Sequence, residues 1–249
     1  MAIKEDVRRL VRQFGFEVLR VPKGAGSRTD EYAPVIPYAT YSPWNKDSSF
    51  QKAYASIKEN TLVDMYRCYE LWTLVGQSAK LDSGSIIEIG VWRGGTGALM
   101  ASQARNVGIT ETVFLCDTFT GVVKAGPMDS SYKGGEHADT TKGIVEDLVF
   151  KRLGLDNVAI LEGIFPDETG QQIEGLKFRL CHIDVDVYES AKGVIDWIWD
   201  RMVPGGIVVY DDFGFAGCGG IAEDVEEQGR GHDPLVVHNL NGHAVVLKL

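Results

Sequence analysis

From residue 85 onward, short apolar runs alternate with segments of helical periodicity, and no other feature of the sequence restricts the fold as much. The apolar runs lie at 85–89, 112–116, 158–161, 179–183 and 206–210. Helices are predicted near 95–106, 141–154, 166–174, 188–203 and 219–229. Strands that alternate with helices form βαβ units, which give a parallel sheet with helices on both faces. The sequence therefore predicts a doubly wound α/β fold.

The C-terminal end departs from this pattern. Apolar runs at 235–238 and 243–247 flank the sequence Asn-Leu-Asn-Gly at 239–242. An Asn-Gly pair between two such runs is a strong signal for a β-hairpin. We therefore expect the last strand to run antiparallel in an otherwise parallel sheet, which distinguishes this chain from an all-parallel dinucleotide-binding fold.

The first 80 residues have a different character. Apolar residues at helical spacing near the N-terminus predict an amphipathic helix; they are Val7, Leu10, Val11, Phe14 and Val18. Residues 21–48 are rich in Pro, Gly, Tyr and Ser, and helical patterning returns over 49–80. We expect 1–80 to form a helical extension and cover, and 81–249 to form the α/β domain.

Charge and composition exclude several classes of partner. The net charge is −10, whereas a nucleic-acid groove needs clustered Lys and Arg. No apolar run reaches the about 18 residues that span a membrane, and the N-terminus has no apolar signal core. The four cysteines form no CxxC pair, and Cys116 and Cys181 lie in apolar runs. Buried, reduced thiols in a cytoplasmic protein are expected.

A glycine-rich segment, IIEIGVWRGGTG, follows the first predicted strand at 86–97. Glycines at such a turn let a ligand approach the backbone closely. Their spacing is GxxxGG rather than the GxGxxG of NAD-binding folds, and Glu88 suits a cationic amino-acid group better than a pyrophosphate. Taken alone, the segment fits a cofactor site or a tight turn without a ligand.

The second predicted strand ends in Asp117, which is followed by Thr118 and Phe119. A carboxylate at this strand end can accept hydrogen bonds from ribose hydroxyls. Asp residues that cap turns are also common. Together with the glycine-rich segment, Asp117 favours a cofactor that contains adenosine.

Acidic pairs end two further strands. Asp184 and Asp186 follow the run at 179–183, and Asp211 and Asp212 follow the run at 206–210. Ligands bind outside the carboxyl ends of the strands in such sheets, so Asp184, Asp211 and Asp212 could converge. Crowded carboxylates repel one another unless a cation lies among them, and oxygen ligands favour Mg²⁺, with Mn²⁺ and Ca²⁺ as alternatives. The other interpretation is that these residues cap or flank loops.

The chain resembles the macrocin O-methyltransferase family over most of its length from about residue 36. The resemblance lies in TYSPW (40–44), TLVDMYRCYELW (61–72), EIGVWRGGTG (88–97), CDTF (116–119), LEGIFPDE (161–168), IDVDVYES (183–190) and VPGGIVVYDDFG (203–214). It implies a Rossmann-like, seven-stranded class I methyltransferase fold. It also implies S-adenosylmethionine and Mg²⁺ as cofactors, and methylation of sugar hydroxyls on bacterial natural products.

The resemblance assigns roles to residues. It places Glu88, Gly90 and Asp117 at the cofactor, with Thr118 and Phe119 beside them. Thr61 begins a segment that closes over the cofactor, whereas Gly163, Ile164 and Phe165 are expected to line the adenine. The metal carboxylates are Asp184, Asp211 and Asp212, and Asp184 also borders the cofactor.

Some positions depart from the family pattern and leave the catalytic base open. Asp184-Val185-Asp186 stands where Asp-Gly-Asp is common, and Phe213-Gly214-Phe215 stands where some members carry a histidine base. The loop 120–140, an expected lid, has no close match. Asp184 is our first choice of base, with Asp186 and His137 as alternatives.

The expected activity is Mg²⁺-dependent methylation of a sugar hydroxyl, on a glycosylated natural product or on a nucleotide-linked deoxysugar. A catechol-type O-methyltransferase acting on an aromatic diol is the alternative, and an NAD-dependent oxidoreductase is a remote one. A non-catalytic interaction protein is disfavoured by the complete set of strand-end carboxylates. The aromatic connector, with Tyr38, Tyr41 and Trp44, is expected to cover the site or to support a homo-oligomer.

Overall fold

In the computed structural model, the described residues are 10–11, 13–14, 32–33, 35, 39–231 and 233–249. The chain divides into two compact units, 1–36 and 37–249. In the first unit, Leu10, Val11 and Gln13 are helical. The other positions of the predicted amphipathic helix, Val7 and Val18, lie outside the described residues, as does Tyr38 of the connector.

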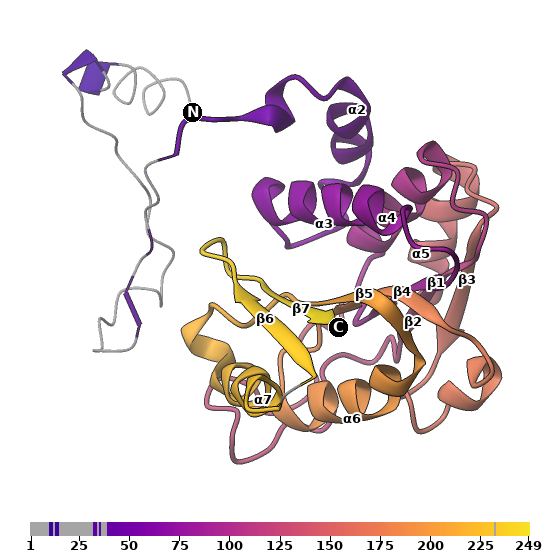
Figure 1. The fold of residues 1–249 in the computed structure, drawn as a ribbon, viewed down its shortest axis with the longest axis vertical. Coiled ribbons are helices and arrows are strands. Elements are labelled where there is room, and N and C mark those ends of the chain that lie inside the picture. Colours follow the sequence, from indigo (N-terminus) through magenta and orange to yellow (C-terminus); the bar gives the residue numbers. More distant parts are fainter. Residues whose placement is uncertain (1–9, 12, 15–31, 34, 36–38, 232) are drawn as a thin grey trace. The chain divides into compact units, whose positions relative to one another are not determined.

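A seven-stranded sheet forms the centre of the second unit (Figure 1). Its strands are β1 (Ser85–Ile89), β2 (Val113–Asp117), β3 (Val158–Glu162), β4 (Phe178–Ile183), β5 (Met202–Tyr210), β6 (Pro234–His238) and β7 (Ala244–Lys248). The order is β3-β2-β1-β4-β5-β7-β6, and β1 to β5 pair in parallel. Among the described strands, β7 pairs antiparallel with both β5 and β6, which confirms the predicted hairpin and the class I methyltransferase fold.

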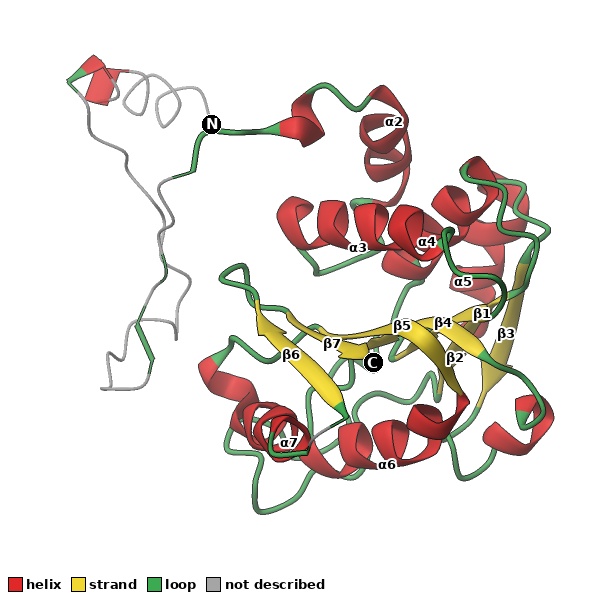
Figure 2. Cartoon of the chain, in the orientation of Figure 1, coloured by secondary structure: helices red, strands yellow, loops and turns green. Residues whose placement is uncertain are grey.

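Helices cover both faces of the sheet (Figure 2). One face carries α2 (Ser48–Ile57), α3 (Met65–Ser78), α4 (Gly95–Asn106) and α5 (Lys142–Glu146), the last continued by a π-helix at Asp147–Arg152. The other face carries α6 (Tyr188–Ile198) and α7 (Gly219–Gly229). Short 3₁₀ helices lie at Pro43–Asn45, Gly170–Ile173, Trp199–Arg201 and Ala216–Cys218.

The two-residue period of the strands divides the core into two layers. Along β1, Ile86 belongs to the cluster beneath α2 to α5, and Ile87 belongs to the cluster above α6 and α7. The same alternation separates Leu180 from Cys181 along β4. Because both faces are covered, these strands are near-continuous apolar runs, as parallel strands buried on both sides must be.

The helical region predicted over 49–80 consists of two helices separated by residues 58–64. Asp47 caps α2 by accepting from the Phe50 amide, and Asp64 caps α3 by accepting from the amides of Tyr66 and Arg67. Both helices lie in the same compact unit as the sheet, which spans 37–249. That the N-terminal region covers the site stays a prediction.

One predicted helix is largely wrong. Residues 166–174 form turns followed by only a short 3₁₀ helix at Gly170–Ile173. Gly170 approaches Trp197 so closely that an added Cβ would lie 3.1 Å from its indole nitrogen. Glycine at 170 and again at 175 also disfavours a longer helix, because glycine loses the most conformational freedom there.

The aromatic connector packs partly on its own chain. The Trp44 ring lies edge-on to Tyr66 and Tyr69, at centroid distances of 5.1 and 5.9 Å, whereas Tyr41 is 82% exposed. All four cysteines are free and buried, as predicted. Within the described residues, we find no helix with both the length and the apolar character needed to cross a membrane.

Asp224, on the buried face of α7, makes the stability of the protein depend on pH. The Tyr210 hydroxyl donates to Asp224 Oδ2 at 3.0 Å, and Asp224 Oδ1 has no partner among the described residues. Burial raises the pKa of Asp224 from its ordinary 3.8 to about 6. A raised carboxyl pKa means that the folded protein loses stability as the pH rises from 3.8 through about 6, because the folded state resists ionisation of this group.

We therefore expect Asp224→Asn to raise the free energy of unfolding at pH 8 and to leave it nearly unchanged at pH 4. A shift of about two pKa units corresponds to a gain on the order of 3 kcal/mol. Urea unfolding at both pH values measures it, with Glu226→Gln, an exposed residue of the same helix, as the control. An equal effect of Asp224→Asn at the two pH values would contradict this account.

Candidate functional site

The site lies where the strand order reverses. β1 and β4 are neighbours whose following connections leave in opposite directions, and ligands of doubly wound sheets bind in the crevice formed there. Gly90 follows β1 with φ of 87°, and a Cβ at this position would lie 1.6 Å from the carbonyl oxygen of Asp184. Only glycine fits, so the backbone after β1 passes directly against the end of β4.

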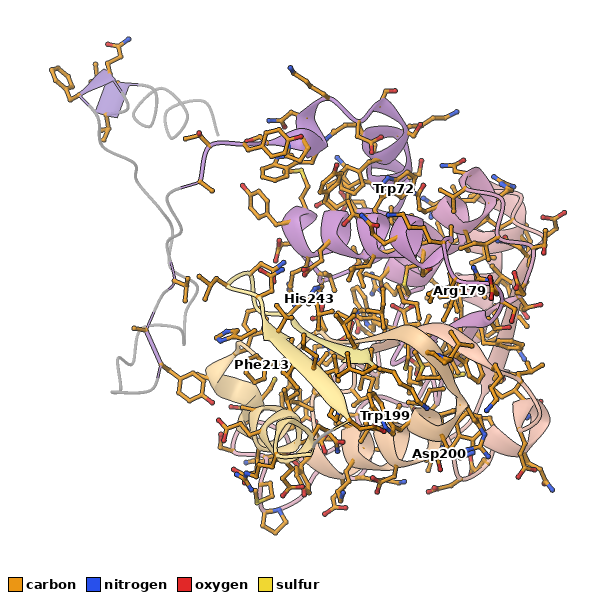
Figure 3. All side chains as sticks on the ribbon, in the orientation of Figure 1. Trp72, Arg179, Trp199, Asp200, Phe213 and His243 are labelled. Carbon is orange, nitrogen blue, oxygen red and sulfur yellow. The ribbon has the colours of Figure 1, made fainter. Side chains whose placement is uncertain are left out.

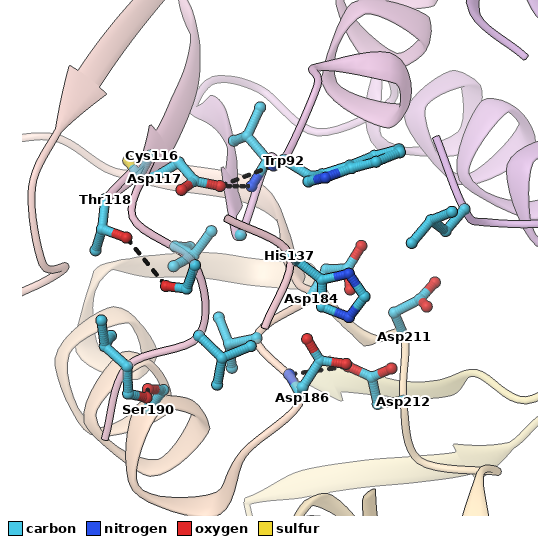
Figure 4. A pocket seen from close by; sticks show the side chains of 18 of the residues that line it. Trp92, Cys116, Asp117, Thr118, His137, Asp184, Asp186, Ser190, Asp211 and Asp212 are labelled. Atoms are coloured by element: carbon cyan, nitrogen blue, oxygen red, sulfur yellow. Dashed lines mark hydrogen bonds between the residues drawn. The ribbon is translucent and has the colours of Figure 1, made fainter. Parts of the chain in front are cut away.

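A cavity of about 360 Å³ opens at this point (Figure 4). It brings together most of the residues that the sequence singled out, namely Thr61, Gly90, Asp117, Thr118, His137, Gly163, Ile164, Phe165, Asp184, Asp186, Asp211 and Asp212. Glu88 and Phe119 are not among the lining residues. The cavity has the size and concave form of a small-molecule site.

Asp117 holds the glycine-rich turn. Its Oδ2 accepts from the amides of Val91 and Trp92, both at 2.7 Å, and its Oδ1 accepts from the Phe119 amide at 2.7 Å. Phe119 itself packs against the core below α4. Asp117 thus borders the cavity and also fixes the backbone on either side of it.

The loop after β2, the expected lid, borders the cavity. Gly121, Val122, Tyr132 and His137 all line it. Asp139 fastens the loop to the glycine-rich turn, accepting from Trp92 Nε1 at 2.9 Å and from Arg93 Nη2 at 2.7 Å. Figure 4 shows His137 beside the acidic side chains that follow β4 and β5.

The acidic residues converge as the sequence predicted. Asp184, Asp211 and Asp212 each place a carboxylate oxygen within 4.8 Å of the others. Asp186 lies beside them: its Oδ1 accepts from the Tyr132 hydroxyl at 2.5 Å, and its amide donates to Asp212 Oδ2 at 3.1 Å. Hard oxygen donors at this separation suit a divalent cation such as Mg²⁺.

The electrostatics of the three carboxylates are unequal. Burial and then the neighbouring negative charges raise the pKa values of Asp184 and Asp212 well above the usual range. Burial alone would also raise the pKa of Asp211, but His182, His243 and Arg67 lower it well below its ordinary value. Asp184 and Asp212 thus lack the positive partner that Asp211 has, and a bound cation would supply it.

A buried row of ionisable side chains crosses the sheet beneath α3, and sequence reasoning missed most of it. We call Glu88, His182, Asp211, His243 and Glu70 the polar row. Glu88 pairs with His182 in the register of β1 and β4, and the Nδ1 of His182 lies 2.8 Å from Glu88 Oε1. Burial would lower the pKa of His182, but the carboxylates of Asp211 and Glu88 raise it to about 9.

The polar row includes Glu88, which the sequence singled out. This residue is fully buried against His182 and is not among the lining residues of the cavity, so its role at the cofactor stays a prediction. The signal that could have revealed the row is an ionisable residue inside an apolar run. Glu88 in SIIEI and His182 in FRLCHI both fit that description.

Arg67 of α3 is a second residue that sequence reasoning missed. Its Nε donates to Asp64 Oδ2 at 2.8 Å, its Nη1 donates to Asp211 Oδ2, and its guanidinium lies 4.7 Å from the centre of the Phe215 ring. It lines the cavity and is 7% exposed. The start of α3 is thereby joined to the carboxylates at the end of β5.

Comparison with known proteins agrees with this geometry. The family model described as macrocin-O-methyltransferase (TylF) matches residues 51–246. The 8-demethyl-8-(2,3-dimethoxy-alpha-L-rhamnosyl)-tetracenomycin-C 4'-O-methyltransferase of Streptomyces olivaceus is 30% identical over 61% of this chain and 61% of its own length. The mycinamicin III 3''-O-methyltransferase of Micromonospora griseorubida is 30% identical over 64% and 67%, respectively. The matched region thus spans about two thirds or less of these relatives.

Solved structures share the fold. The O-methyltransferase NovP is 22% identical, with a TM-score of 0.63 over 76% of this chain and 81% of its own. The calicheamicin methyltransferase CalS11 is 17% identical, with a TM-score of 0.62 over 90% and 98%. At these identities, the likeness concerns the arrangement of the strands and helices.

The position of Asp117 leads to a prediction for cofactor binding. We expect Asp117→Ala to weaken binding of S-adenosylhomocysteine by about 1–3 kcal/mol, because hydrogen bonds to a charged acceptor are lost. Calorimetry measures this loss. Glu162→Gln is the matched control, since Glu162 lies opposite Asp117 in the register of β2 and β3 but does not line the cavity. Unchanged affinity in Asp117→Ala would show that this carboxylate has no part in cofactor binding.

Proposed function

Because the chain belongs to the macrocin O-methyltransferase family, we propose that it transfers the methyl group of S-adenosylmethionine to a hydroxyl group of a sugar. One observation carries the proposal: a single cavity unites the glycine-rich turn and Asp117 on one side with three convergent carboxylates on the other. A methyl donor and a cation-dependent acceptor site would thus adjoin each other.

The residues present fit S-adenosylmethionine. Gly90 leaves the backbone open beside β1, Asp117 offers a carboxylate at the end of β2, and Ile164 and Phe165 offer apolar surface after β3. Thr61, in the segment between α2 and α3, lines the same space. When bound, the cofactor supplies an electrophilic methyl group on a sulfonium centre.

The residues present also fit a divalent cation, with Mg²⁺ preferred and Mn²⁺ or Ca²⁺ as alternatives. Asp184, Asp211 and Asp212 would hold it, since their oxygens converge, and burial followed by the neighbouring carboxylates raises the pKa values of Asp184 and Asp212, which a cation would offset. When bound, the cation supplies Lewis-acid stabilisation to an acceptor hydroxyl.

The acceptor proton needs a base, and we assign this role to Asp186 ahead of Asp184 and His137. Asp186 stands beside the three metal carboxylates rather than among them, and its Oδ1 is oriented by the Tyr132 hydroxyl. Burial raises its pKa, which makes it a better proton acceptor than an ordinary carboxylate. Asp184 is occupied by the cation in this scheme, and His137, which lines the same cavity, stays the alternative base.

The acceptor is proposed to be a sugar of a glycosylated natural product, in keeping with the rhamnosyl tetracenomycin and mycinamicin substrates named for the two relatives. A nucleotide-linked deoxysugar is the alternative. Five carboxylates line the cavity, from Asp117, Asp184, Asp186, Asp211 and Asp212. Arg67, the permanently charged cation among the lining residues at 39–231 and 233–249, is already paired with Asp64 and Asp211. The excess of negative over positive side chains around the cavity favours a neutral glycoside over a negatively charged diphosphate.

A catechol-type O-methyltransferase would place a lysine base after the metal site. Within 39–231 and 233–249, none of the residues that line the cavity is a lysine. The glycine spacing GxxxGG and the antiparallel β7 likewise disfavour an NAD-dependent oxidoreductase. The geometry therefore supports the sugar acceptor over both alternatives.

We expect methyl transfer from S-adenosylmethionine to a neutral glycoside to stop in EDTA and to resume with added Mg²⁺. Asp212→Asn removes a metal ligand and most of the activity, yet it raises the melting temperature of the EDTA-treated protein at pH 8, because ionising a group with a raised pKa costs stability. Asp211→Asn leaves Arg67 and the histidines without their buried partner, and it lowers stability by about 3–5 kcal/mol. Radiolabel transfer and thermal melts measure these effects. Full activity in excess EDTA would refute the metal mechanism.

We also propose that the protein acts as a homo-oligomer in the cytoplasm. The exposed Tyr41 and the aromatic connector support the first part, and the four free, buried thiols support the second. We expect light scattering at micromolar concentration to report more than one copy, and Tyr41→Ser to reduce the association. A single species of 27.3 kDa would contradict it.

A further inference from the structure

The proposed cation site depends on where the Asp211 carboxylate is held. The residues that contact this carboxylate and offset its charge were not among the site residues predicted from the sequence. Tyr210 pairs with Ala244 in the antiparallel register of β5 and β7, so Asp211 and His243 lie opposite each other at the next position. The Nε2 of His243 lies 2.9 Å from Asp211 Oδ1. The other oxygen, Oδ2, accepts from Arg67.

The imidazole of His243 is itself held at its second nitrogen. His243 is fully buried, and its Nδ1 lies 2.6 Å from Glu70 Oε2 on α3. Glu70 also accepts from the side-chain amides of Asn239 and Asn241, in the turn of the C-terminal hairpin. Figure 3 shows His243 where this hairpin approaches α3. Because both nitrogens are engaged, the ring cannot turn without breaking a buried hydrogen bond.

Arg67 and His243 contact different oxygens of the Asp211 carboxylate. Arg67 alone could draw the carboxylate into a paired contact with its guanidinium, away from Asp184 and Asp212. The hydrogen bond from His243 to the other oxygen opposes that rotation. Each carboxylate oxygen has a second acceptor direction, so Asp211 can keep both contacts and still face a cation.

We propose that His243, anchored by Glu70, is a positioning residue that orients Asp211 for the divalent cation and so sets the cation affinity. This inference rests on the proposed function, because it presumes that Asp184, Asp211 and Asp212 hold the ion. Neither residue lines the cavity, and neither touches substrate or cofactor in this scheme. Their effect passes through the orientation of one carboxylate, as partners of metal ligands commonly act.

A pair of substitutions separates the two contacts of His243. In His243→Gln, the side-chain amide takes about the place of Nε2 and can still donate to Asp211, but not to Glu70. In His243→Asn, the amide takes about the place of Nδ1 and can still donate to Glu70, but not to Asp211. His238→Asn, at the far end of the hairpin turn, is the matched control.

The measurement is binding of Mn²⁺ alone, followed by electron paramagnetic resonance of the free ion. We expect His243→Asn to weaken Mn²⁺ binding by about 10- to 100-fold, His243→Gln to remain near the wild type, and His238→Asn to match it. Affinity for S-adenosylhomocysteine should be unchanged in all three, which also shows that each is folded. Glu70→Ala, which removes the anchor and keeps the imidazole, should weaken Mn²⁺ binding by a smaller factor.

The outcomes separate this inference from the function on which it rests. Wild-type protein that binds no Mn²⁺ would overturn the proposed cation site, and this inference with it. Wild-type protein that binds Mn²⁺, with His243→Asn and Glu70→Ala binding equally well, would overturn the positioning role alone. Lower melting temperatures in both His243 variants at wild-type Mn²⁺ affinity would likewise show that the contact serves only stability. If His243→Asn fails to bind S-adenosylhomocysteine, Glu70→Ala decides the question.

Discussion

Buried charge at the carboxyl end of the sheet determines how the surrounding elements are arranged. Asp184, Asp211 and Asp212 end neighbouring strands in a space closed to water on most sides. A buried charge without a partner is costly, so each must be paired, hydrogen-bonded or kept protonated. Asp211 has positive partners within the fold, whereas Asp212 accepts from the Asp186 amide, and burial followed by the neighbouring negative charges raises the pKa values of Asp184 and Asp212.

The need to pair the buried Asp211 carboxylate explains why elements far apart in the sequence meet at the end of β5. Arg67 and Glu70 come from α3, His182 from β4, and His243 from the residue before β7, and all are joined through Asp211. The antiparallel β7 is what brings His243 opposite Asp211. The C-terminal hairpin therefore places His243, a hydrogen-bond donor, beside the proposed cation site.

The cofactor side and the acidic side of the cavity are linked by one short stretch of chain. Residues 60–63 line the cavity immediately before Asp64 caps α3, and Arg67 in the first turn of α3 contacts Asp211. The Asn60 carbonyl accepts from the Gly95 amide at the start of α4. A change at the carboxylates thus has a direct structural route to the segment that borders the cofactor side.

The strands, the hairpin and the acidic cluster were predictable from the amino-acid sequence, since they follow from local periodicity, turn chemistry and the meeting of parallel strand ends at one edge. The helix that the sequence predicted near 166–174 does not form, and Gly170 there packs closely against Trp197. Nor could the sequence foresee that Glu88 faces His182, or that Glu70, His243 and Arg67 serve Asp211. Those contacts depend on strand register and on the seating of α3 over the sheet, which join residues separated by up to 173 positions. They become visible in the folded chain alone, because a long-range contact between ionisable groups leaves no periodic signal along the sequence.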